Sequence, residues 1–385
     1  MYANLNLKGC INYMKNIVKS AAAVVLAGAL LCASGCSDTK WSFKTDSKAL
    51  SSGVWIYYTF EGVSDALAKV QETDEKATLD SIDFEKDKIE NKIAKDWAYA
   101  EAKKKELRYL TLDKLASDLK AEVTDESYNS AKSMYSGIYK SYYSEMFEKL
   151  GVSEESYCQA NAMPGLLSDA VFEKIYGKAG TKEVSDKDVE AYFVDNYVSY
   201  YYTYCDLTTS TDASSESSGT VEAAQRLDAE TIAKYQENMT KYANMLNNGG
   251  KTTDDVTEEY KKDFNVETAL TASDTTPKSN LSTTNEVYKA ILDAAEGKAF
   301  TKEINDKLYM IYRFDIKEKA KDIKSNDDAT EDDTKTISRE TVVKNMKSEE
   351  FNKYLDEEQS NLKYTRNDAC IHKYDVLRTV SILKG

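Results

Sequence analysis

Long stretches without a helix breaker dominate this chain. Only two prolines, Pro164 and Pro277, occur in 385 residues. Proline costs about 3 kcal/mol in a helix interior, whereas the abundant lysine, glutamate and alanine favour helix. Apolar residues recur every three or four positions in most of these stretches, which predicts amphipathic helices. The predicted helices cover residues 49–70, 89–120, 124–151, 153–177, 184–193, 222–247, 253–264, 285–295 and 338–361.

Three shorter stretches favour strands. In residues 197–207, Tyr200, Tyr202 and Tyr204 alternate with other side chains, which is the period of a strand. Residues 299–304 and 308–316 have a similar pattern, and residues 370–383 are expected to be extended. The Ser/Thr-rich stretch 208–220 and the acidic stretch 322–336 have the composition of linkers. We therefore predict an α+β chain that is mostly helical.

The N-terminus has the layout of an export signal. The first 35 residues contain Lys8, Lys15 and Lys19 but no acidic residue, and an apolar run covers residues 21–32. A bilayer core of about 30 Å needs ~20 apolar residues, so this run is too short to span it. Met14 directly precedes Lys15, so the sequence leaves Met14 open as an alternative to Met1 for the start of translation.

The end of this signal resembles a lipobox. Ala33-Ser34-Gly35-Cys36 has the small residues and the cysteine found at the cleavage site of bacterial lipoproteins. The resemblance implies cleavage before Cys36, a diacylglycerol on its sulfur, and anchoring on the outer face of the cytoplasmic membrane. The alternative is an ordinary secretory signal with a coincidental cysteine. Residues 36–48 are polar and are expected to form a tether.

Composition excludes several classes of function. The net charge is −15, which disfavours nucleic-acid binding. Cleavage leaves Cys36, Cys158, Cys205 and Cys370; the last two are the most plausible pair, but no disulfide framework is expected. His372 is the only histidine, so the chain has too few histidines for a histidine-based zinc site and little basis for a catalytic triad. Acidic pairs such as Asp254-Asp255 lack the spacing of a calcium loop. We expect no metal and no cofactor.

The order of elements resembles parvulin-type extracellular foldases of the PrsA and SurA group. The sequence Asp186-Lys187-Asp188-Val189-Glu190-Ala191-Tyr192-Phe193 before a strand is similar to the entry into their parvulin domain, and residues 285–314 are similar to its exit. The resemblance implies a helical chaperone domain that surrounds an inserted peptidyl-prolyl isomerase domain. The implied parts are 49–195 (helical domain), 196–318 (parvulin-like domain), 319–337 (acidic linker) and 338–385 (C-terminal helix and tail that complete the helical domain).

The chain departs from this family at its catalytic positions. The first parvulin strand usually carries a histidine where Tyr202 or Tyr204 stands here, and the last strand carries one where Tyr309 stands. A tyrosine hydroxyl donates and accepts hydrogen bonds but cannot reproduce a pair of imidazoles. Isomerase activity is therefore expected to be weak or absent. The clients implied by the resemblance are unfolded or partly folded exported polypeptides.

A row of large side chains in the third predicted helix is a candidate surface for such clients. Tyrosine and methionine are adaptable, half-polar linings. The alternative is that these residues pack into the domain's own core, as helical apolar stripes usually do. The other functions that the sequence leaves open are a solute-binding and a structural surface lipoprotein. The candidate client-binding residues are Tyr135, Tyr139, Tyr142, Tyr143 and Met146.

Overall fold

The computed structural model describes residues 39–209, 225–248, 250–323 and 337–385. The signal segment with Cys36 and most of both predicted linkers lie outside these ranges. Of the described residues, 61% are helical and 15% are in strands, so the prediction of a mostly helical α+β chain is confirmed. In this part of the chain, no helix has the length and the apolar composition to cross a membrane.

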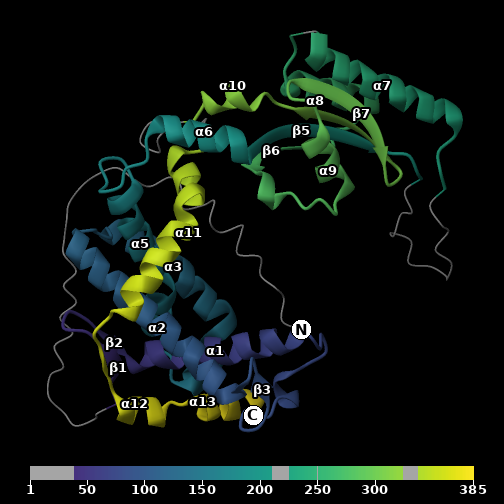
Figure 1. Cartoon of the computed structure of the whole chain (residues 1–385). Helices are drawn as coiled ribbons and strands as arrows, with labels where there is room; N and C mark the ends of the chain where they lie inside the picture. Colours follow the sequence, from purple (N-terminus) through teal and green to yellow (C-terminus); the bar gives the residue numbers. More distant parts are fainter. Residues whose placement is uncertain (1–38, 210–224, 249, 324–336) are drawn as a thin grey trace, which may run out of the picture. The chain divides into compact units, whose positions relative to one another are not determined.

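The chain forms two compact units (Figure 1). Unit 1 combines the residues up to Glu183 with Lys347–Gly385, and unit 2 is Val184–Met346. Unit 1 is therefore built from two separate stretches of sequence. The boundaries expected at residues 196 and 318 lie inside unit 2. Helix α6 (Asp186–Asn196) and the start of α11 (Arg339–Ser360) also belong to that unit.

Unit 1 is mainly helical. Helices α1, α2 and α5 contact one another, and α3 packs on α5. Ser51, Thr124 and Ser153 cap α1, α3 and α5 through their side-chain oxygens, as polar residues at helix starts do. The elements are β1 (Trp41–Lys44), β2 (Ala49–Ser51), α1 (Ser52–Gln71), η3 (Leu79–Ser81), β3 (Lys88–Ile89), β4 (Lys92–Ile93), α2 (Ala94–Leu119), α3 (Asp125–Ile138), η4 (Tyr139–Tyr143), α4 (Ser144–Leu150), α5 (Glu154–Tyr176), most of α11, β9 (Thr365–Arg366), α12 (Asp368–Lys373) and α13 (Val376–Lys384).

The C-terminal stretch packs against the first helices of unit 1. Strand β9 pairs with β1, and the indole of Trp55 on α1 donates a 2.9 Å hydrogen bond to the carbonyl of Tyr374. Val376 and Val380 on α13 are buried in one cluster with Val63 and Trp97. Residues that are more than 300 positions apart thus share one core.

Three local predictions are wrong. Within the expected tether 36–48, Ser42 and Phe43 are fully buried in β1, because their partner β9 comes from the other end of the chain. Residues 370–383 are helical rather than extended, since Asn367 and Asp375 cap α12 and α13. The helix expected from residue 89 begins at Ala94, after a hairpin.

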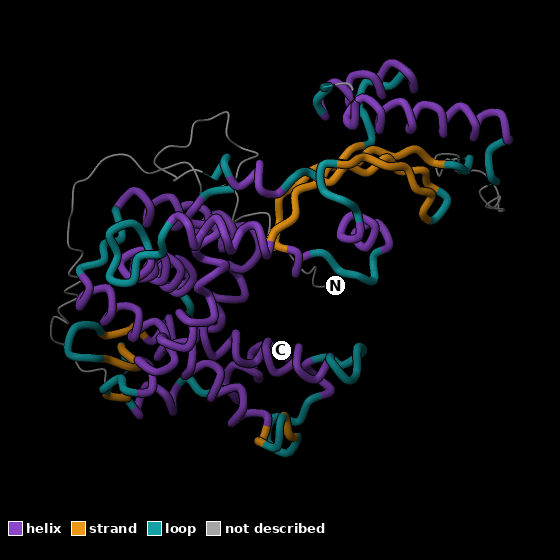
Figure 2. The backbone as a smooth tube through the Cα atoms, turned by 45° about the horizontal axis from the view of Figure 1, so that its top comes forward, coloured by secondary structure: helices purple, strands orange, loops and turns teal. Residues whose placement is uncertain are grey.

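Unit 2 contains an antiparallel four-stranded sheet in the order β6-β5-β8-β7. Helices α7 and α8 cover one face of this sheet and α9 covers the other (Figures 1 and 2). Asn305 and Asp306 turn β7 into β8 with positive φ angles of 50° and 57°. The elements are α6, β5 (Tyr197–Asp206), α7 (Ala229–Asn248), α8 (Thr253–Phe264), β6 (Thr271–Pro277), η5 (Lys278–Asn280), α9 (Glu286–Asp293), β7 (Lys298–Ile304), β8 (Lys307–Arg313), α10 (Ile316–Ala320) and the start of α11.

Candidate functional site

The structure brings Tyr202, Tyr204 and Tyr309 together on the α9 face of the unit 2 sheet. Tyr204 on β5 stands directly opposite Tyr309 on β8, and their ring centroids are 5.2 Å apart. The Tyr202 ring meets the Tyr309 ring edge-on at 5.7 Å. Alternation along β5 places Tyr202 and Tyr204 on the same face. The sequence did not decide whether Tyr202 or Tyr204 stands at the position of the family's histidine. In the structure, both rings contact Tyr309.

This tyrosine face is packed through rings rather than through hydroxyl groups. Tyr309 is buried, whereas Tyr202 and Tyr204 are half-buried. Burial raises the pKa of Tyr202 and of Tyr309, so both phenols are neutral at physiological pH. Among the hydrogen bonds of the described residues, none involves the hydroxyl of any of the three. The Nζ of Lys307 lies 4.6 Å from the centroid of the Tyr204 ring, at the end of the face.

Helix α9 decides how much of this face is open. Its Ala290 and Ile291 are buried in one cluster with Tyr200 and Tyr309. Tyr202 and Tyr204 only border that cluster. The face therefore leaves two half-buried aromatic rings open to a ligand, while Lys307 at its end is already paired with Asp206 over 2.5 Å. An aromatic surface of this kind can bind apolar or proline-containing chain, but it lacks the linked polar groups of a paired-imidazole centre.

The predicted client-binding row in unit 1 is divided by a change of helix type. Residues Tyr139–Tyr143 form a π-helical turn between α3 and α4. The rings of Tyr135, Tyr139 and Tyr143 nevertheless all meet the ring of Tyr157 on α5, at centroid distances of 6.3, 5.6 and 6.1 Å. Tyr139 is buried, while Tyr135, Tyr143 and Met146 are half-buried. Tyr142 is 70% exposed.

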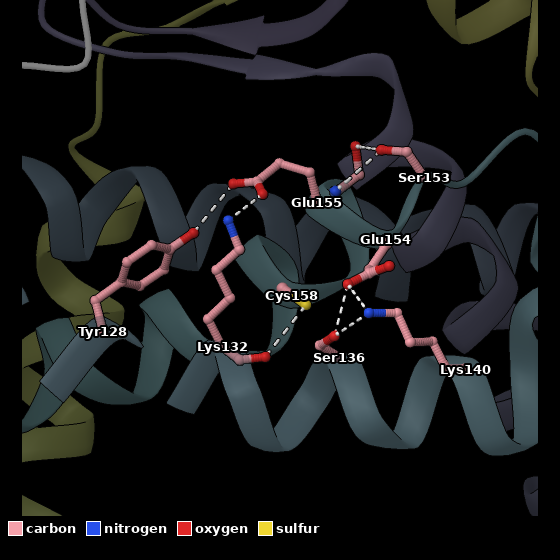
Figure 3. A network of polar contacts seen from close by, with 9 residues as sticks. Tyr128, Lys132, Ser136, Lys140, Ser153, Glu154, Glu155 and Cys158 are labelled. Atoms are coloured by element: carbon pink, nitrogen blue, oxygen red, sulfur yellow. Dashed lines mark hydrogen bonds and ion pairs between the residues drawn. The ribbon is translucent and has the colours of Figure 1, made fainter. Parts of the chain in front are cut away.

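Polar contacts hold α3 on the first turns of α5 (Figure 3). Tyr128 donates to Glu155 over 3.2 Å, and Lys132 forms an ion pair with the same carboxylate. One helical turn further on, Ser136 donates to Glu154 over 2.6 Å. These contacts position the helix that carries Tyr135 and leads into the π turn.

An aromatic cavity lies beside this turn. Its volume is about 200 Å³. Tyr157 on α5 is central to its wall, because its ring lies 5.3 Å from both Tyr57 and Phe147. The Tyr143 ring lies 5.3 Å from Phe147, which places one predicted client-binding residue in this wall. The aromatic walls of the cavity are Tyr57, Phe60, Tyr143, Phe147 and Tyr157.

Sequence reasoning missed Tyr57 and Tyr157 as parts of a site. Both lie in predicted helices, but nothing in their own stretches indicates that they meet. Their ring contact joins α1 to α5, which are about 100 residues apart in the sequence. The only signal available from the sequence was that several predicted helices carry aromatic residues, and this signal does not distinguish a cavity from an ordinary core.

The remaining predicted residues give no further site. Cys36 lies outside the described residues. Cys158, Cys205 and Cys370 are free and buried, so the plausible pairing of Cys205 with Cys370 is not formed. The described ranges contain no group of three or more His, Cys, Asp and Glu side chains that could hold a metal ion. No protein-family model and no curated protein matches this chain.

Proposed function

We propose that the protein is a membrane-anchored extracytoplasmic chaperone of the foldase type. In this proposal Cys36 carries the lipid, on the outer face of the cytoplasmic membrane of a bacterium. Unit 1 is the helical chaperone domain of the PrsA and SurA type, and unit 2 is the parvulin-like insertion. The clients are unfolded or partly folded exported polypeptides.

The observation that carries the proposal is the discontinuous helical unit. Unit 1 is closed by Lys347–Gly385 and is interrupted by a mixed unit with an aromatic sheet face. This is the arrangement that the resemblance to foldases implies. The half-exposed tyrosines of both units are surfaces that suit unfolded chains, which offer apolar side chains to any adaptable aromatic partner.

The tyrosine face supports a weak isomerase at most. A catalyst of X-Pro isomerisation must favour the twisted imide over both planar forms, across a barrier of about 18–20 kcal/mol. The hydroxyls of Tyr202, Tyr204 and Tyr309 form no hydrogen-bond network among the described residues. In the proposed function, unit 2 therefore binds chain and contributes little catalysis. In a protease-coupled peptide assay, acceleration at the level of an ordinary parvulin would contradict this part.

Suppression of client aggregation tests the main proposal. The mature chain should reduce light scattering by a chemically unfolded client at near-stoichiometric ratios, whereas a solute receptor should have no effect. Tyr142→Ser should weaken the suppression without a change in Tm, because this side chain is 70% exposed. Val266→Ser, at a position 42% exposed just after α8, the helix that covers the sheet face opposite Tyr202, Tyr204 and Tyr309, is the matched control. Unchanged scattering with the intact chain would end the chaperone proposal.

The anchor is tested separately by cell fractionation. Cys36→Ser removes the only sulfur available at the proposed cleavage site. We expect the variant to leave the membrane fraction or to keep its uncleaved signal. A variant that is processed and stays with the membrane as the parent does would contradict lipid attachment at this residue.

A further inference from the structure

We propose that the aromatic cavity of unit 1 binds a single cationic group, an ammonium or a guanidinium. Its walls are five aromatic side chains and its edge carries Glu61 and Asp65. If the cation belongs to a client polypeptide, the inference rests on the proposed chaperone function, and the site would select lysine or arginine side chains of the client. All residues involved lie within unit 1.

The aromatic wall offers ring surfaces to a cation. A cation is attracted to the face of an aromatic ring, and the attraction grows when water is excluded. Tyr57 and Tyr157 are only 6% and 5% exposed, so neighbouring side chains cover most of each ring and little water reaches the part that borders the cavity. Burial raises the pKa of both phenols, which keeps these walls neutral.

One polar group in the wall has no partner. Tyr157 lines the cavity, and its hydroxyl makes no hydrogen bond among those of the described residues. The hydroxyl of Tyr57, by contrast, lies 3.0 Å from Glu61 and 2.9 Å from the side-chain oxygen of Asn161. The Tyr157 hydroxyl is not one of the fully buried polar atoms, so it is accessible from the cavity, and a ligand N–H could donate a hydrogen bond to it.

The carboxylates at the edge have an excess of negative charge. Glu61 and Asp65 share one cation, the Nζ of Lys105, at 3.2 and 2.9 Å. The three groups together carry a net charge of −1. A positively charged ligand in the cavity would neutralise this excess, whereas an anion would be repelled by it. The acidic character of the whole chain adds to the attraction.

Lys105 makes the proposal specific. It is an internal cation that already interacts with the two carboxylates at the edge. Removing its charge should therefore strengthen the binding of an external cation, because both carboxylates become available. Damage to the fold would have the opposite effect, so the sign of the change separates a binding site from a structural ion pair.

A pair of peptides tests the site on the full mature chain. One labelled Gly/Ser heptapeptide carries a central arginine, and the other carries citrulline, which has nearly the same shape but no charge. Fluorescence anisotropy should give about tenfold tighter binding of the arginine peptide, as expected for a partly desolvated cation on aromatic rings. Equal affinities, the result for a cavity filled only by water, would overturn the proposal.

Variants of the chain complete the test. Lys105→Gln should raise the affinity for the arginine peptide severalfold, whereas Glu61→Gln should lower it. Tyr157→Phe keeps the ring and should lower it through the hydroxyl alone, so this variant decides the matter if Lys105→Gln fails to fold. Glu72→Gln, which removes an exposed partner of Lys69 directly after the C-terminal end of α1, is the matched control. A lower affinity in a folded Lys105→Gln would contradict the assignment.

Methylguanidinium separates the sources of the cation. If it competes with the arginine peptide and binds nearly as tightly as the peptide, the cavity is a site for free small cations. If it competes only weakly, the peptide chain contributes and the client is the ligand. Both results support the cation site. A chain that binds arginine but does not suppress aggregation would contradict the proposed function and leave the cavity assignment standing.

Discussion

At the scale of single residues, the buried carboxyl of Glu106 is the least expected feature. It lies on α2 with no exposed surface, and its Oε2 has no hydrogen-bond partner among the described residues. The Oγ of Ser42 is within hydrogen-bonding distance of both Oε1 of Glu106 and the carbonyl of Leu50. One hydroxyl has one proton, so both contacts are satisfied when Glu106 is protonated and donates to Ser42. Burial accordingly raises the pKa of Glu106 to about 8.

This carboxyl should make the stability of unit 1 depend on pH. The unfolded chain releases the proton near pH 4.5, whereas the native state keeps it up to about pH 8. Between these values the native state binds more protons, so stability falls as pH rises, by up to about 1.4 kcal/mol per pH unit. Glu106→Gln should flatten this slope and raise stability at pH 7, as measured by urea unfolding. Glu122→Gln changes an exposed residue and should leave the pH dependence of stability unchanged. If Glu106→Gln has the same pH dependence as the parent chain, Glu106 is not the group responsible.

Tyr309 allows the contribution of a ring to be separated from that of its hydroxyl. The ring contacts Tyr202 and Tyr204, and the hydroxyl has no hydrogen bond among the described residues. Tyr309→Phe should therefore change the free energy of unfolding by less than about 0.5 kcal/mol. Tyr309→Ala should cost about 3 kcal/mol, because a large buried side chain is removed. A large effect of Tyr309→Phe would indicate a hydrogen-bonded role that the structure does not contain.

At the scale of elements, one glycine sets how closely α1 and α2 approach. A Cβ at Gly62 would overlap the backbone carbonyl oxygen of Ala98 on α2. Gly165, inside α5, has nothing within 4 Å of the same position. Gly62→Ala should destabilise the chain by at least about 1–3 kcal/mol through overpacking. Gly165→Ala should stabilise it by up to about 1 kcal/mol, since alanine is the better helix former. Thermal unfolding that moves in the same direction for both variants would contradict this view of the contact.

Local signals explain which elements the sequence predicted. The helix starts at Thr124 and Ser153 were predicted because a capping side chain and the backbone N–H that it accepts from are only three residues apart. Strand β5 was found from its alternation, since its tyrosines follow a period of two. The edge strand β6 was missed, because its polar residues are half-exposed and carry no apolar pattern. Strand β1 and the aromatic cavity were missed for a different reason: their partners lie far away in the sequence.

The π turn shows how an element can mislead about a site. Residues 124–151 were expected to be one helix, and their tyrosines to share one face. A π turn interrupts this helix at Tyr139–Tyr143, and although Tyr139 and Tyr143 both contact the ring of Tyr157, Tyr142 is exposed. No residue in the turn is a helix breaker. The rings that Tyr139 and Tyr143 contact come from α4 and α5, and a local pattern does not contain these contacts.

At the scale of the whole molecule, each unit has a core of its own. In unit 1, Val63, Trp97 and Val380 belong to one buried cluster. In unit 2, Met310 and Tyr242 belong to another, on the α7 and α8 face of the sheet. Residues that share a core unfold together in one cooperative transition. Because the two units have separate cores, we expect calorimetry to show two separable unfolding transitions.

Variants in the two cores assign these transitions. Met310→Ala deletes a fully buried side chain of unit 2 and should lower one transition, by an amount equivalent to about 2–5 kcal/mol. At pH 8, Glu106→Gln should raise the other, because the carboxyl in unit 1 is then partly charged in the parent chain. Helix α11 contributes to both units, so a shift of about 1 kcal/mol or less in the second transition is compatible with separate cores. A single transition that both variants move to the full extent would mean that the two units unfold together.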